Sequence, residues 1–213
     1  KRALNRAVTL LPTLRLSMEP GGLGACRGIV SDDLFAGRLA QIAVFPSSSQ
    51  FSASELSYLS CFASDPGDAI QFWGLLGAEG ASVRARDIAL RSLMQYLNGL
   101  EGFQKPEGSV LERWKEYFRR LLVTSEVTEL LGQGLKAVAA MQDKAAIPAI
   151  ADITLSQRRA DARVGAVCAA AAIAKAHPEA WQEYLLRLKD TSHLPQMIQK
   201  YLKNPETCKA KHH

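Results

Sequence analysis

Few side chains in this chain of 213 residues combine the types and spacing that catalysis requires. Glu112 and Glu116 lie one helical turn apart, a spacing at which two carboxylates can share a metal ion. Arginines and lysines flank them, so we interpret both as members of solvated ion pairs. His177 directly precedes Pro178 at a predicted helix end, where a histidine interacts with the helix dipole rather than acting as a general base. These residues predict no catalytic centre, cofactor, metal site or small-molecule substrate.

The spacings of the glycines and cysteines also match no phosphate-binding or zinc-binding motif. Residues 21–24 read Gly-Gly-Leu-Gly, but no strand precedes them and no phosphate-binding fingerprint follows, so they predict a turn or linker. The four cysteines, Cys26, Cys61, Cys168 and Cys208, form neither a Cys-x-x-Cys pair nor a zinc-type Cys/His cluster. Cys61 and Cys168 fall in apolar helical patterns, and we interpret them as buried free thiols. This fits a reducing compartment, although the spacing leaves disulfides open.

Arginines offer the main candidate for binding chemistry. They gather in three groups along the chain, and seven of them form our candidate basic partner-binding surface: Arg84, Arg91, Arg113, Arg119, Arg120, Arg158 and Arg159. The net charge of +5 suits an anionic partner such as RNA, a lipid headgroup or an acidic protein. If stacked repeats carried these groups, equivalent positions would line up on one surface. The alternative is that each group is an ordinary solvated helix face.

Helical periodicity dominates the elements that must position these arginines. Apolar spacing and breaker residues predict five consecutive pairs of helices, over residues 31–64, 66–100, 109–141, 143–177 and 178–203. Pro66 suits a first-turn position, Ser82 suits an N-cap, and Ser109-x-x-Glu112 has capping-box spacing. We therefore expect an all-α chain.

Three regions follow from this pattern. Residues 1–30 form a basic N-terminal segment and glycine-rich linker, residues 31–204 a helical-repeat domain, and residues 205–213 a flexible basic tail. The first segment has no acidic residue before Glu19, a charge pattern typical of organelle targeting. This predicts a mitochondrial protein; an ordinary basic helix that packs on the domain, in a cytoplasmic protein, is the alternative. No apolar run is long enough to predict a transmembrane segment.

A run of small residues over 159–173 is the most distinctive segment. Alanine has the highest helix propensity and little bulk, so an alanine-rich helix invites close approach by its neighbours. The run contains an Arg-x-x-Ala spacing at Arg163 and Ala166. The same spacing occurs at Arg86 and Ala89, 77 positions earlier, which is close to twice a helical repeat of about 40 residues.

Residues 143–177 resemble one unit of the HEAT and armadillo-like repeat families. Pro148 lies near the start of a first helix, Asp161 follows in the turn, and Arg163 opens the second helix. The resemblance implies that Asp161 and Arg163 serve the turn. It also implies that the close helix contact is made by three alanines, at positions 166, 169 and 170.

The implied fold is a right-handed stack of antiparallel helical hairpins, an α-solenoid. The resemblance is loose over 66–100, the Arg-x-x-Ala marker is missing from 109–141, and an irregular helical bundle is the alternative. We expect a non-enzymatic scaffold or accessory subunit that binds other protein subunits of a larger assembly. The alternative function is an organellar RNA-binding helical-repeat protein.

Overall fold

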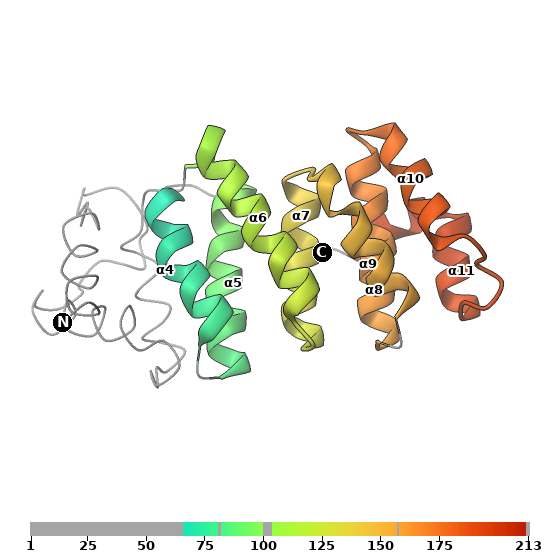
Figure 1. The fold of residues 1–213 in the computed structure, drawn as a ribbon, viewed down its shortest axis with the longest axis horizontal. Helices are drawn as coiled ribbons and strands as arrows, with labels where there is room; N and C mark the ends of the chain where they lie inside the picture. The colour runs from blue at the N-terminus through green and yellow to red at the C-terminus, as the bar shows by residue number, and fades with distance from the viewer. Residues whose placement is uncertain (1–65, 81, 100–103, 157, 212–213) are drawn as a thin grey trace, which may run out of the picture. The chain divides into compact units, whose positions relative to one another are not determined.

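The computed structural model describes residues 66–80, 82–99, 104–156 and 158–211, and every regular element in these ranges is helical (Figure 1). The all-α prediction is therefore confirmed for this part of the chain. The predicted 31–64 pair, the basic N-terminal segment and Cys61 lie outside the described residues. The chain divides into two compact units between Val110 and Leu111.

The first unit contains the helix pair α4 (Pro66–Glu79) and α5 (Val83–Asn98), which pack against each other (Figure 1). Pro66 begins α4 as predicted. Ser82 caps α5, because its Oγ accepts a hydrogen bond from the Ala85 N–H at 3.1 Å. Gly99 ends α5 with φ of 61°, a left-handed conformation that glycine adopts without a Cβ penalty. These local signals explain why the predicted pair forms.

The second unit carries six α-helices, and α6 begins just before the boundary. Their bounds are α6 (Gly108–Thr124), α7 (Thr128–Ala140), α8 (Ile147–Leu155), α9 (Ala160–Ala174), α10 (Pro178–Leu188) and α11 (Gln196–Lys203). Two 3₁₀ segments, η2 (Lys144–Ala146) and η3 (Pro205–Lys211), precede α8 and follow α11. These bounds agree with the three predicted pairs.

The alanine-rich helix α9 lies at the centre of the second unit. It packs against α7, α8, α10 and α11, and α8 also packs against α10 (Figure 1). Helices two apart in the sequence are thus neighbours in space. Ala166 and Ala170 are fully buried, and a Cβ added at Gly165 would lie 3.4 Å from Leu135 Cδ1 of α7. Small residues of α9 therefore let four helices approach it closely, as the composition predicted.

Glycines of α7 play different roles. A Cβ at Gly134 would lie 3.0 Å from Leu122 Cδ2 and 3.4 Å from Leu121 Cδ2, both on α6. A Cβ at Gly132 would meet nothing within 4 Å. A side chain at position 134 would therefore crowd the leucines of α6, whereas one at position 132 would not.

A buried hydrogen bond joins α8 to α10. Thr154 Oγ1 donates to the Ile150 carbonyl at 3.0 Å, so the Tyr184 hydroxyl, 2.8 Å from Thr154 Oγ1, is the donor in the second bond. Burial raises the pKa of Tyr184, which keeps the hydroxyl protonated and available as a donor. This bond fixes the register of the two helices inside the core.

The same kind of arginine contact occurs in two separate helix pairs. Arg86 Nε of α5 donates to the Gly77 carbonyl of α4 at 2.8 Å. Arg163 Nε of α9 donates to the Thr154 carbonyl of α8, also at 2.8 Å. In each case the acceptor lies nine residues earlier, among the last four carbonyls of a helix, which have no partner within it. The guanidinium satisfies that carbonyl and places positive charge at the negative end of the helix dipole.

The interpretation of Cys168 as a free thiol is wrong. Cys168 of α9 and Cys208 of η3 form a disulfide, with their Cα atoms 5.3 Å apart and 40 positions between them in the sequence. η3 packs against both α9 and α11, which brings Cys208 to α9. Residues 205–211, expected as a flexible tail, therefore form a 3₁₀ segment that is covalently joined to the central helix.

Ala166→Leu should lower the free energy of unfolding by about 1–3 kcal/mol, because a fully buried position at the centre of four helices has no room for three more carbons. Urea denaturation of the full chain measures this. Ala140→Leu, at an exposed position of α7, is the matched control and should change stability by less than about 0.5 kcal/mol. Equal effects of the two substitutions would contradict the close packing of α9.

Arg163→Ala should cost about 1–3 kcal/mol, because it leaves the Thr154 carbonyl without its charged donor. Arg159→Ala removes an arginine four residues earlier whose exposed ion pair with Asp161 contributes little. Denaturant melts of the two variants separate the roles. If both variants were as stable as the parent chain, the Arg163 contact would not stabilise the α8–α9 turn.

Candidate partner-binding surface

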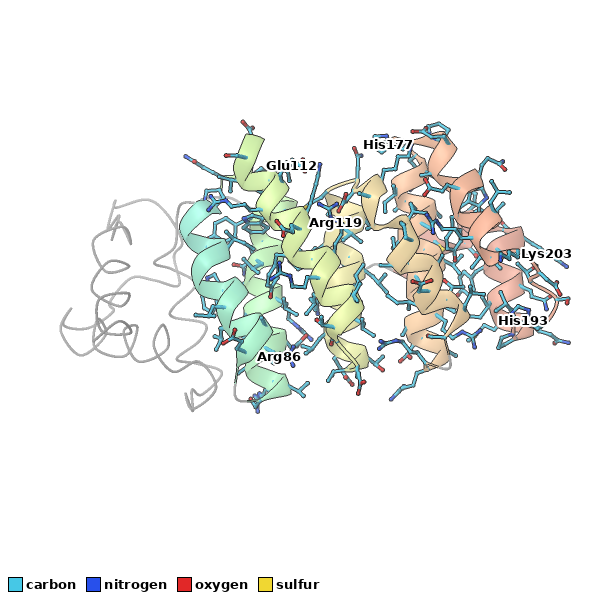
Figure 2. All side chains as sticks on the ribbon, viewed as in Figure 1. Arg86, Glu112, Arg119, His177, His193 and Lys203 are labelled. Carbon is cyan, nitrogen blue, oxygen red and sulfur yellow. A yellow bond between two sulfur atoms is a disulfide. The ribbon has the colours of Figure 1, made fainter. Side chains whose placement is uncertain are left out.

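The seven arginines singled out from the sequence occupy three kinds of position. Arg84 and Arg91 lie on α5 of the first unit; Arg113, Arg119 and Arg120 lie on α6; Arg158 and Arg159 lie in the turn between α8 and α9. Figure 2 shows Arg119 and Glu112 projecting from the same helix, α6. The candidate surface thus combines residues from the second helix of one predicted pair, the first helix of the next pair, and the turn within a third pair.

Most of these arginines already have partners. Four form ion pairs with carboxylates: Arg91 with Asp87 at 2.8 Å, Arg119 with Asp143, Arg120 with Glu116, and Arg159 with Asp161, the last three at 3.3 Å. Arg158 instead donates from Nη1 to the Ser125 carbonyl at 2.8 Å, joining the α8–α9 turn to the α6–α7 turn. Ion pairing neutralises much of the positive charge locally, and the Arg158 contact is structural.

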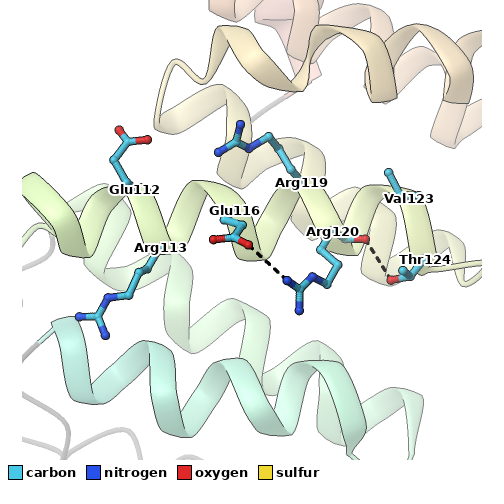
Figure 3. Close-up of a pocket in the computed structure, with 7 residues that line it drawn as sticks. All are labelled: Glu112, Arg113, Glu116, Arg119, Arg120, Val123 and Thr124. Carbon is cyan, nitrogen blue, oxygen red and sulfur yellow. Dashed lines mark hydrogen bonds and ion pairs between the residues drawn. The ribbon is translucent and has the colours of Figure 1, made fainter.

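The exposed face of α6 is the best-defined surface feature. Seven residues of this helix line a shallow hollow (Figure 3): Glu112, Arg113, Glu116, Arg119, Arg120, Val123 and Thr124. The face bears three arginines against two glutamates, and the side chain of Val123 is 70% exposed at its end. The opposite face of α6 is buried through Trp114, Phe118, Leu121 and Leu122. Helix α6 therefore has one solvent-exposed face and one buried face.

Local ion pairs organise this face. Lys115 Nζ contacts Glu112 Oε1 at 2.8 Å, and the Lys115 ammonium lowers the pKa of Glu112 through this hydrogen bond and its charge. Arg120 and Glu116 are one turn apart and joined by the dashed line in Figure 3. The side chains on this face thus form ion pairs of alternating charge.

Asp143, a residue that the sequence analysis did not single out, lies beneath this face. Its side chain is 5% exposed, and its Oδ2 lies 3.3 Å from Arg119 Nε without hydrogen-bond geometry. Burial raises the pKa of Asp143, and the charges of Arg119 and Lys115 only partly oppose that effect. Sequence reasoning missed Asp143 because the burial of a single carboxylate depends on tertiary packing.

Other chemistry is sparse in the described ranges. No group of three or more histidine, cysteine or acidic side chains there is arranged to hold a metal ion. None of the helices described is both long enough and apolar enough to cross a bilayer. Large apolar side chains are exposed singly, with Leu186 of α10 the most accessible at 76%. Single exposed residues of this kind can serve as anchors at an interface.

Asp143→Asn should stabilise the chain at neutral pH. A carboxyl whose folded pKa lies above its unfolded value destabilises the fold once it ionises, so stability falls as pH rises between those two values. Because asparagine does not ionise, the Asp143→Asn chain should not lose stability in this way. Below the pKa of Asp143 in the unfolded state, the variant and the parent chain should be equally stable. Urea melts from acidic to neutral pH test the difference.

Asp152→Asn makes the same chemical change at an exposed position of α8, and as the control it should alter stability by less than about 0.5 kcal/mol. A neutral-pH loss of stability in Asp143→Asn would mean that the ion pair with Arg119 outweighs the cost of burying the carboxylate.

Comparisons with known proteins find no family model, curated protein or solved structure that matches this chain. Similarity therefore assigns neither a family nor an activity. A function must be inferred from the contacts, burial and charge of the described residues.

Proposed function

We propose that this protein is a non-enzymatic helical-hairpin repeat protein that serves as a scaffold or accessory subunit of a larger assembly. The observation that carries the proposal is the repeated arginine contact, in which Arg86 and Arg163 bond carbonyls nine residues earlier in two separate helix pairs. A recurrent contact at the same place favours repeated units over an irregular bundle.

Contacts between turns also support a repeat. Arg158 reaches the Ser125 carbonyl 33 residues earlier, linking two turns that each join the helices within a pair. Lys144 Nζ of η2 contacts Glu179 Oε1 at 3.0 Å, 35 residues later, linking the connection before α8 to the first turn of α10. These separations fall within the range of helical-hairpin repeats. The two contacts thus span nearly the same interval.

Surface composition is compatible with a protein partner. Leu186 and Val123 are exposed apolar side chains on α10 and α6, each among charged neighbours. Protein interfaces combine a few apolar anchors with a polar rim of this kind. The binding energy would then come from these anchors, and the surrounding ion pairs would set specificity.

RNA binding is the less supported alternative, because ion pairs engage four of the seven candidate arginines. The mitochondrial location stays a prediction, because residues 1–30, which carry the targeting-like charge pattern, lie outside the described residues. The disulfide between Cys168 and Cys208 favours a compartment that permits oxidation, in place of the reducing one suggested by cysteine spacing.

Affinity capture of the tagged full chain from its native source should recover protein partners in stoichiometric amounts. Leu186→Ser should weaken recovery about tenfold or more, because it removes an exposed apolar anchor. Gln182→Ser, one turn earlier on α10, removes only a polar side chain and is the matched control. Quantitative mass spectrometry of the captured material measures both.

Two results would count against the scaffold. One is a chain that behaves as a monomer and recovers no protein in stoichiometric amount. The other is recovery of RNA whose affinity falls steeply with added salt and is abolished by charge reversal at Arg113, Arg119 and Arg120, since phosphate contacts release counterions.

A further inference from the structure

Helix α9 presents a second face that the core does not fully cover. Partly exposed residues recur along it with helical spacing: Val164, Gly165, Cys168, Ala171 and Ala172. All except the valine are small, so this face offers a smooth surface close to the backbone. Segment η3 packs against α9, and its Cys208 is bonded to Cys168 in the middle of this face.

A covalent bond joins this segment to α9. Among residues 205–208, whose burial is described, Cys208 is the buried one at 8% exposure, and Glu206 is exposed. Thr207 bonds locally, because its N–H and its hydroxyl both donate to the Asn204 carbonyl, at 3.1 and 2.8 Å. Ordering the segment costs conformational entropy, and the covalent bond is a constraint on it that reduction removes.

We propose that the Cys168–Cys208 disulfide is a redox-controlled strap. In the oxidised protein it holds residues 205–211 against α9, and reduction releases the segment and uncovers the small-residue face while the helices of the unit stay folded. This inference does not depend on the scaffold function, since it concerns only the chain's own segment.

Reduction proceeds through thiol–disulfide exchange with an external dithiol. A thiolate of that dithiol attacks the sulfur of Cys168, the more exposed partner, and forms a mixed disulfide as Cys208 leaves as a thiolate and takes up a proton. The second thiol of the dithiol then displaces Cys168, which also becomes a thiol. Two electrons pass to the protein, and the dithiol leaves as its own disulfide.

Limited trypsin digestion of the oxidised and dithiothreitol-reduced full chain tests the release. Cleavage after Lys203, the last residue of α11, and after Lys209, within η3, should become at least about tenfold faster on reduction, because opening of the segment no longer requires breaking a covalent bond. Far-UV circular dichroism should stay unchanged. Cys208→Ser should match the reduced chain without reductant and should not respond to it, which controls for the other cysteines.

Alkylation of Cys168 in the Cys208→Ser chain is a second measurement, read by site-specific mass spectrometry. Its rate should equal that in a chain that ends at Asn204, where nothing covers the face. A rate about tenfold slower would mean that the segment stays seated without the bond, since protection tracks the closed population. Unchanged trypsin cleavage after verified reduction, loss of helical signal on reduction, or a bond that dithiothreitol cannot reduce without denaturant would each overturn the proposal.

Discussion

Close packing around the alanine-rich helix α9 is the constraint on which the second unit depends. Four helices contact α9, and its buried alanines leave their side chains enough room to do so. Because α9 contributes little bulk, its neighbours provide the large apolar groups, such as Leu135 of α7 and Tyr184 of α10. The same smallness leaves few bulky side chains on the outer face of α9, where Cys168 is bonded to Cys208 of η3.

The ends of helices create a second requirement that packing alone does not meet. Carbonyls in the last turn of a helix lack partners, and a close-packed turn excludes the water that could satisfy them. Arg86 and Arg163 meet this need by bonding the preceding helix from the start of the next one. An arginine engaged in this way contributes to folding, and its charge is no longer free for a partner.

Arginines that stabilise the fold are not free to bind a partner. Several arginines that form a basic cluster in the sequence are paired with carboxylates or backbone carbonyls in the structure, including Arg119, Arg120 and Arg158. What remains exposed is a surface of alternating charge with isolated apolar residues such as Leu186. On the basis of that surface we propose a protein partner in preference to RNA.

Local physical chemistry lets the sequence by itself determine the helices. The period of apolar residues, the cap at Ser82 and the prolines at Pro66 and Pro178 predict α4 to α11 closely, because each signal acts within a few residues. The spacing shared by Arg86 and Arg163 was also visible, since it places the same contact at the same point of a helix pair.

Tertiary structure alone decided which distant residues meet. Cys168 pairs with Cys208 because η3 returns to α9, and Asp143 Oδ2 lies 3.3 Å from Arg119 Nε although 24 positions separate the two residues in the sequence. The interpretation of Cys168 as a free thiol was wrong, since nothing in its local pattern reports a partner 40 positions away. Burial and cross-linking depend on the packing of separate elements, whereas helix formation depends on neighbours in the chain.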